Sequence, residues 1–104
     1  MSWILLAIAG LLEIVWATTM KASNGFTVLV PSIVTVVGIV ASLSLLAVAM
    51  KELPAGPSYM VWTGIGAVGT FIAGVILHGE ALNATRIAAA VLIVAGMTLM
   101  KLDT

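Results

Sequence analysis

Residues 3–20 read WILLAIAGLLEIVWATTM, an apolar stretch that contains one charged side chain, Glu13. A helix needs about 20 mainly apolar residues to cross a hydrocarbon core of roughly 30 Å, and this stretch is close to that length. It ends at Lys21, and the segment Ala22-Ser23-Asn24-Gly25 then offers the turn-forming residues expected at a membrane surface. We therefore expect a first membrane-spanning helix here, rather than a cleaved secretory signal, which would begin with a basic segment.

Three further apolar stretches follow along the chain. Pro31 stands near the start of the second, the segment Pro54-Ala55-Gly56-Pro57 separates the second from the third, and Asn83 suits the N-cap of the fourth. Strands fit poorly, because membrane barrels use many strands of about ten alternating residues. The fold class expected is thus all-α integral membrane, with residues 1–104 forming a single domain of four short transmembrane helices. These helices are expected at about residues 3–20, 31–50, 58–77 and 84–100.

The composition excludes several classes of protein. Hydrophobic residues make up 62% of the chain, charged residues only 8%, and the mean hydropathy is +1.29. A soluble domain carries roughly 25% charged residues, so we do not expect a water-soluble fold. The net charge is zero and basic residues do not cluster, which leaves no electrostatic footprint for nucleic acid. The chain has no cysteine, so disulfides and thiol chemistry are excluded as well.

The basic residues at the ends of the spans give no preferred orientation. With four spans, Lys51 and Lys101 fall on one side of the membrane and Lys21 and Arg86 on the other, so the positive charges are balanced. Two interpretations remain open. Either a small asymmetry sets one orientation, or copies insert both ways and pair antiparallel, which is called dual topology.

Glu13 is the only charge that the sequence places deep in the bilayer. It lies ten residues after Trp3, about 15 Å along a helix and so near the midplane. A charge there costs roughly 2.5–3.5 kcal/mol on insertion scales. Glu13 is therefore expected to be protonated, paired with a cation, or facing a wet cavity. No basic residue lies deep in any span, so the counter-ion could be a cationic substrate; a protonated carboxyl group that joins helices is the alternative.

Helical spacing gives Glu13 neighbours that fit a cation site. Gly10, Trp16 and Ala17 fall on its face, because residues three and four apart are adjacent on a helix. Gly10 and Ala17 would leave room beside the carboxylate. Trp16 offers an aromatic face and an indole N–H, although it could instead be lipid-facing bulk.

The third apolar stretch carries a second group of candidates. Tyr59 and Trp62 are three residues apart and Gly66 continues the same face, which suits an aromatic cation box. Gly64 and Gly66 could add a hinge. Close packing of another helix against the glycines explains them equally well.

Two small or polar positions complete the candidates. Ser42 is the deepest hydroxyl of the second stretch, on the side of Thr35 and Gly38, and a serine there more often bonds its own i−4 carbonyl. Ala89 and Gly96, seven residues apart in the fourth stretch, form a small-residue stripe that predicts a dimer interface. A homodimer would bring two Glu13 carboxylates together, and such a pair titrates jointly. Competition of protons and a cation for that pair would give antiport.

No nucleophile–base pair, phosphate-binding loop or metal-ligand set occurs, so we expect no enzyme, no cofactor and no metal site. The motifs, however, match a known pattern. Glu13–Ala17 (EIVWA), Lys21–Phe26 (KASNGF), Pro54–Gly56 (PAG) and Tyr59–Gly66 (YMVWTGIG) together resemble the small multidrug resistance family along essentially the whole chain. The resemblance implies an antiparallel dual-topology dimer in a prokaryotic inner membrane, which exchanges protons for a cation by alternating access.

Within this family, Trp16 and Thr63-Gly64 are similar to the guanidinium-exporter branch, because the drug-exporting branch usually has glycine at the first position. The resemblance implies that Glu13 is the shared carboxylate and that Ser42, Tyr59 and Trp62 are binding-site residues. Pro57 and Ser58 depart from the family pattern and could shift Tyr59. The expected function is proton-coupled export of guanidinium. A quaternary-ammonium exporter, a non-transporting membrane subunit and one half of a heterodimer are the alternatives.

Overall fold

The computed structural model describes residues 2–103, and every regular element in this range is a helix. The helices are α1 (Ser2–Ala22), α2 (Leu29–Ala49), α3 (Ala55–His78) and α4 (Ala84–Leu102). All four are long and apolar enough to cross a membrane. The prediction of an all-helical protein with four spans is confirmed.

The helix ends differ from the predicted ones at the two prolines. α2 begins at Leu29 and α3 at Ala55, so Pro31 and Pro57 each occupy the third helical position instead of preceding or opening the helix. A proline is tolerated there because the first backbone N–H groups of a helix have no intrahelical partner. The N-cap prediction for Asn83 is confirmed, since its side chain accepts a hydrogen bond of 2.9 Å from the Arg86 backbone N–H.

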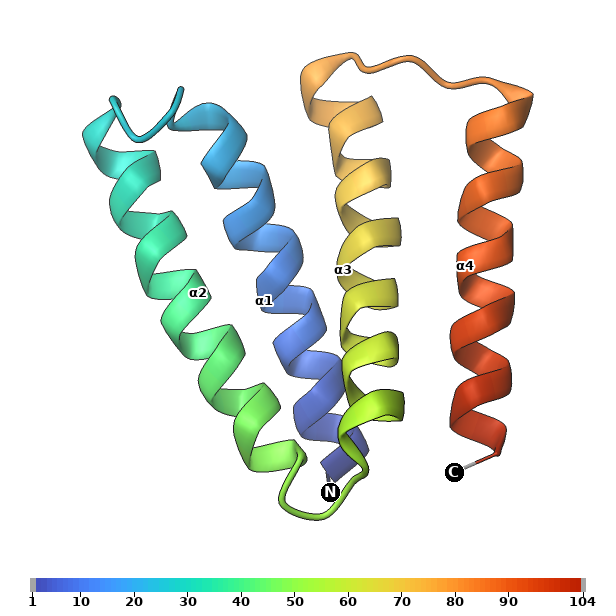
Figure 1. Cartoon of the computed structure of the whole chain (residues 1–104). Coiled ribbons are helices and arrows are strands. Elements are labelled where there is room, and N and C mark those ends of the chain that lie inside the picture. The colour runs from blue at the N-terminus through green and yellow to red at the C-terminus, as the bar shows by residue number, and fades with distance from the viewer. Residues whose placement is uncertain (1, 104) are drawn as a thin grey trace.

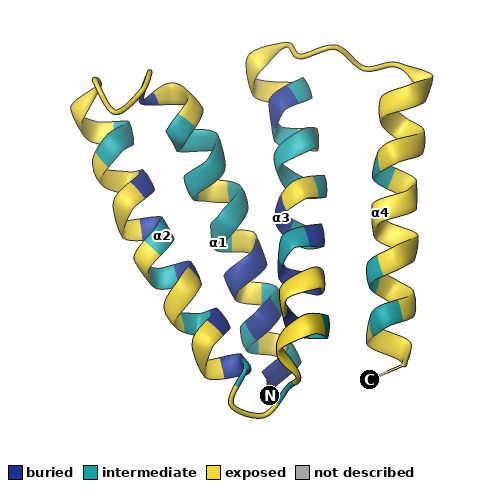
Figure 2. Cartoon of the chain, viewed as in Figure 1, coloured by how far each residue is buried: buried dark blue, intermediate teal, exposed yellow. Residues whose placement is uncertain are grey.

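The helices are packed unequally. α1 lies between α2 and α3 and packs along both, whereas α2 and α3 barely touch each other (Figure 1). α4 packs along α3 and stands at the edge of the bundle. Among the described residues, α4 has no buried member, while the inward faces of the other three helices are partly covered (Figure 2).

α2 turns one regular row of residues toward α1. Its buried residues are three or four positions apart, the spacing of a single helix face. They are Thr35, Gly38, Ser42, Leu46 and Ala49. The aliphatic end of this row joins a small core with Leu6, Ala9, Val61 and Trp62. Its polar end lies beside the half of α1 that carries Trp16 and Thr19, where Gly38 meets Trp16 and the Thr35 hydroxyl meets that of Thr19.

Candidate functional site

Glu13 lies against the glycines of α3. A Cβ atom added at Gly66 would overlap the Glu13 carboxylate, and one added at Gly69 would overlap Ile14. α1 and α3 therefore approach closely along this strip, as small residues permit between membrane helices. Glu13 Oε2 is buried and has no hydrogen-bond partner within residues 2–103. The basic side chains at positions 21, 51, 78, 86 and 101 all lie at helix ends or in a loop.

Ser42 joins the three packed helices by hydrogen bonds. Its hydroxyl donates to the Ala9 carbonyl of α1 at 2.7 Å and accepts from the Trp62 indole N–H of α3 at 3.0 Å. The i−4 bond that is usual for a serine within a helix is thus replaced by a bond to a different helix. Ser42 is fully buried and Trp62 is 6% exposed, so this chain of bonds is shielded from solvent.

Tyr59 extends the aromatic surface from Trp62 to the outside. The two ring centroids are 5.4 Å apart with the planes tilted by 40°, and the Tyr59 side chain is 54% exposed. Pro57 and Ser58 fit the start of α3: the fully buried Ser58 hydroxyl donates to the Pro54 carbonyl at 2.7 Å. The two departures from the family pattern are therefore accommodated without breaking the helix that carries Tyr59.

Trp16 faces α2, whereas Gly10 and Glu13 face α3. A Cβ atom at Gly38 would lie 2.7 Å from the Trp16 Cβ, so the α2 backbone touches the base of this side chain. The Trp16 indole nitrogen is buried and has no hydrogen-bond partner among the residues described. The face of α1 predicted to carry Gly10, Glu13 and Trp16 is thus divided between α2 and α3. Glu13 and Trp16 each have one buried polar atom without a hydrogen-bond partner in the described chain.

The other small residues have specific neighbours. The space beside Gly10 is filled by Ile65, whose Cγ2 would lie 2.7 Å from an added Cβ, so in the single chain Gly10 leaves no room next to the carboxylate. Gly64 faces α4, where the Met97 Sδ would lie 2.6 Å from such an atom. Ala17 is partly buried on α1.

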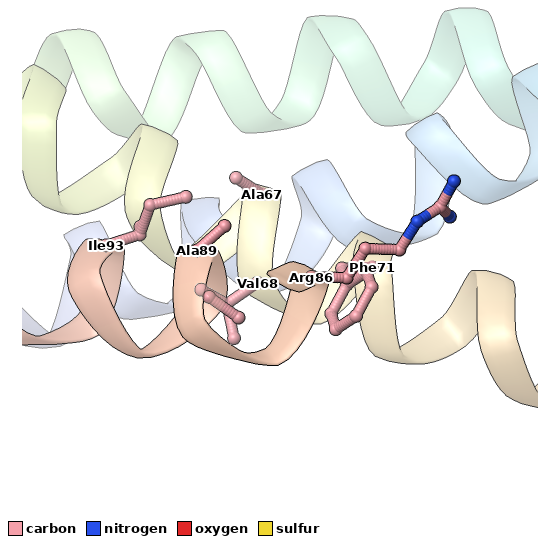
Figure 3. A pocket seen from close by; sticks show the side chains of 7 residues that line it. Ala67, Val68, Phe71, Arg86, Ala89 and Ile93 are labelled. Atoms are coloured by element: carbon pink, nitrogen blue, oxygen red, sulfur yellow. The ribbon is translucent and has the colours of Figure 1, made fainter. Parts of the chain in front are cut away.

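Ala89 and Gly96 lie apart from Glu13, beside the contact of α3 with α4. One pocket of about 260 Å³ includes Ala89 in its lining, and a second of about 340 Å³ includes Gly96 and Tyr59. Figure 3 shows the first pocket, where Ala67, Val68 and Phe71 of α3 meet Arg86, Ala89 and Ile93 of α4. A Cβ atom at Gly96 would meet nothing within 4 Å.

Some contacts of the site were not predicted. The Ala9 carbonyl is a backbone acceptor, and its sequence carries no side-chain signal for this role. Thr19 pairs with Thr35 at 2.7 Å between their hydroxyl oxygens; the side of Thr35 was foreseen from its spacing to Ser42, but its partner was not. Lys101 places its ammonium 5.0 Å from the centre of the Trp3 ring, which adds a cation–π contact at the bundle's end.

Chemically, the site offers a carboxylate and two indole N–H groups, one of them used and one free, in an apolar setting. No group of three or more metal-binding side chains occurs in the range 2–103. Four helices able to span a membrane, with one carboxylate buried between α1 and α3, define a multi-pass membrane protein.

Comparison with known proteins gives the family. The sequence profile described as Small Multidrug Resistance protein matches residues 1–101, and the chain belongs to this family. It is 55% identical over 104 residues to the guanidinium exporter of Escherichia coli (strain K12), covering 100% of this chain and 99% of the relative. The guanidinium exporter of Yersinia pestis is 57% identical over 102 residues, with 98% of each chain covered. The family resemblance is confirmed, and with it the class: a membrane transporter, not an enzyme.

Proposed function

We propose that this protein exports guanidinium cations in exchange for protons, by alternating access across the inner membrane of a bacterium. The observation that carries the proposal is the Glu13 carboxylate. It is packed against Gly66 near the middle of α1, and its Oε2 atom is buried without a partner within the described chain. A buried charge of this kind must be neutralised, and a proton or a cation can each do so in turn.

Guanidinium suits this carboxylate for geometric reasons. It is planar and carries N–H donors on every side, so it can form two parallel hydrogen bonds with a carboxylate. Trp62 and Ser42, joined by the hydrogen bond described above, would form one edge of the site. Trp16 and Tyr59 supply aromatic faces that attract a cation. The relatives named guanidinium exporters share more than half of their residues with this chain over nearly its full length, which supports the same substrate here.

Assembly as an antiparallel homodimer is part of this proposal. α4 packs along α3 and offers no buried residue among those described, while Gly96 leaves open space on its surface. Ala89 and Gly96 would let the α4 helices of two copies approach closely. The balanced positive charges at the two membrane faces favour insertion in both orientations. Such a dimer would bring two Glu13 carboxylates to one site, where protonation and cation binding compete.

Transport by purified protein in proteoliposomes tests the function. The expected result is uptake of guanidinium driven by an outward proton gradient, with little uptake of tetrapropylammonium. Transport of tetrapropylammonium in preference to guanidinium would assign the chain to drug export instead. Transport of neither cation would leave a non-transporting subunit or one half of a heterodimer.

Cysteine labelling tests the topology, because the native chain has no cysteine to interfere. A single cysteine at Asn24, in the exposed loop between α1 and α2, should react with a membrane-impermeant reagent from both sides of sealed vesicles. Reaction from one side only would exclude dual topology.

A further inference from the structure

Trp16 is held by residues that the proposed site does not include. On its α2 side lies Gly38, which would place an added Cβ 3.5 Å from the indole Cγ and Cδ1 atoms in addition to the closer Trp16 Cβ. Because backbone cannot rearrange as a side-chain tip can, Gly38 forms a rigid wall against the first atoms of the side chain. This contact restricts where the indole can turn.

One helical turn beyond Trp16, two threonines join α1 to α2. The Thr35 hydroxyl donates to the Pro31 carbonyl at 2.7 Å, and the Thr19 and Thr35 hydroxyl oxygens are 2.7 Å apart. Each hydroxyl has a single hydrogen to donate. Since Thr35 donates its hydrogen to the Pro31 carbonyl, Thr19 donates to the Thr35 oxygen. The Trp16 carbonyl, 3.2 Å from the Thr19 oxygen, is then a second and weaker acceptor of the Thr19 hydrogen.

This direction of donation links the turn of α1 that carries Trp16 to the first turns of α2. Thr35 is fully buried and Thr19 partly buried, so the link lies within the bundle. The same face of α2 holds Ser42, which binds α1 again at Ala9. Glu13 and Trp16 therefore lie on the part of α1 that α2 fixes at both ends.

We propose that Thr19 and Thr35, together with the Gly38 backbone, are positioning residues that set the orientation of the Trp16 indole and so the size of the cation accepted. This inference rests on the proposed function. The Trp16 indole nitrogen is buried and lacks a partner in the described chain, which leaves its N–H free for a ligand or for the carboxylate that binds it. An indole held in place keeps the site narrow and favours a small planar cation over a bulky one.

The rival explanation is that the threonine pair only packs α1 against α2. Loss of a packing contact would lower the stability of the protein and the total transport rate, but it would change the rates for all cations alike. Positioning of Trp16 predicts a change in selectivity. The ratio of KM for guanidinium to KM for tetrapropylammonium is therefore the deciding quantity.

Thr35→Val removes the hydroxyl and keeps the shape of the side chain. We expect it to raise the KM for guanidinium about threefold, the typical effect of one hydrogen bond between membrane helices, and to lower the KM for tetrapropylammonium in the same proteoliposomes. Thr35→Ser keeps the hydroxyl and should restore both values. Thr98→Val, which removes an exposed hydroxyl bonded within α4, is the matched control and should change neither.

Thr19→Val removes the same link from α1 and carries the same prediction if the Thr35 variant does not fold. An unchanged KM ratio in the folded valine variant, or a serine variant that fails to restore the ratio, would overturn the positioning role. Wild-type protein that moves no guanidinium would overturn the proposed function, and this inference with it. Wild-type transport with an unchanged variant ratio overturns the inference alone.

Discussion

The first three helices have residues that the rest of the chain buries, and the fourth helix differs from them in this respect. α1, α2 and α3 share buried faces and are joined by the hydrogen bonds of Ser42 (Figure 2). The described part of α4 has no buried residue and packs along α3, with the Lys101–Trp3 contact as its link to α1. Every candidate residue for cation binding lies on the three packed helices. The small-residue stripe lies on α4. This difference supports the proposal that the three packed helices carry the cation-binding residues and that α4 carries the dimer contact.

Among changes in the three packed helices, removal of the Glu13 charge should have the largest effect on transport. Glu13→Gln keeps the size of the side chain but can neither release a proton nor balance a cation, so we expect guanidinium uptake to fall to the level of protein-free vesicles. Asp103→Asn makes the same chemical change just beyond α4, where the side chain is exposed, and should transport normally. Uptake by the Glu13→Gln variant at the wild-type rate would remove the carboxylate from the mechanism.

The close approach of α1 and α3 predicts a second large effect. In Gly66→Ala the added methyl group would overlap the Glu13 carboxylate, and overpacking of this kind typically costs about 1–3 kcal/mol. Gly56→Ala is the matched control, because a Cβ there meets nothing within 4 Å. Unfolding of both variants in mixed micelles with increasing denaturing detergent compares them. Equal stability of the two would show that the α1–α3 contact is looser than described.

Substitutions in α4 should weaken dimerisation without preventing the single chain from folding. Gly96→Leu fills open space on α4 and favours the helical conformation, so the single chain should remain folded. If α4 pairs with a second α4 at this position, the bulk should weaken dimerisation by about 1–2 kcal/mol, roughly fivefold to thirtyfold in the dissociation constant. Ala95→Leu places the same side chain at a third pocket, which residues such as Phe71 of α3 and Val91 of α4 also line, and is the control. Energy transfer between labelled copies in detergent measures both. Unimpaired pairing of the Gly96 variant would place the interface elsewhere.

The smallest effect on transport is expected at Ser42. Loss of its hydroxyl removes the hydrogen bonds to Ala9 and Trp62 but leaves the packing of the three helices in place. Ser42→Ala leaves the Trp62 N–H and the Ala9 carbonyl without this partner, at a cost of about 0.6–1.7 kcal/mol for a hydrogen bond between membrane helices. The KM for guanidinium should rise about threefold to twentyfold. Ser44→Ala, on the exposed side of α2, should behave as wild type in the same transport assay. A Ser42 variant indistinguishable from it would show that the buried hydroxyl does not support the site.

The helices were predictable because a bilayer imposes their length and apolar composition, so runs such as residues 3–20 are evident in the sequence. Their first turns were not, because prolines such as Pro31 and Pro57 are compatible with several positions at a helix start. Glu13 was conspicuous as an isolated charge. Its neighbour Gly66 could be placed only on a face of its own helix, since both sides of a membrane helix are apolar and the sequence does not say which helix covers which face.

The contacts of Ser42 and Trp16 show most clearly what the sequence could not predict. The Ala9 carbonyl that accepts from Ser42 is backbone, and every residue of α1 has one. The contact of Gly38 with Trp16 depends on the distance between two helix axes, which spacing along one helix does not determine. Such contacts arise from tertiary packing, and small residues are the only trace they leave in the sequence.

Proton release on binding tests most directly the claim that a cation and a proton exchange at Glu13. Purified wild-type protein in detergent and weak buffer, at a pH where part of the Glu13 population is protonated, should release protons when guanidinium is added. The release should saturate with guanidinium concentration and be absent in Glu13→Gln. Guanidinium binding to the wild-type protein without proton release throughout the pH range would contradict exchange at this carboxylate.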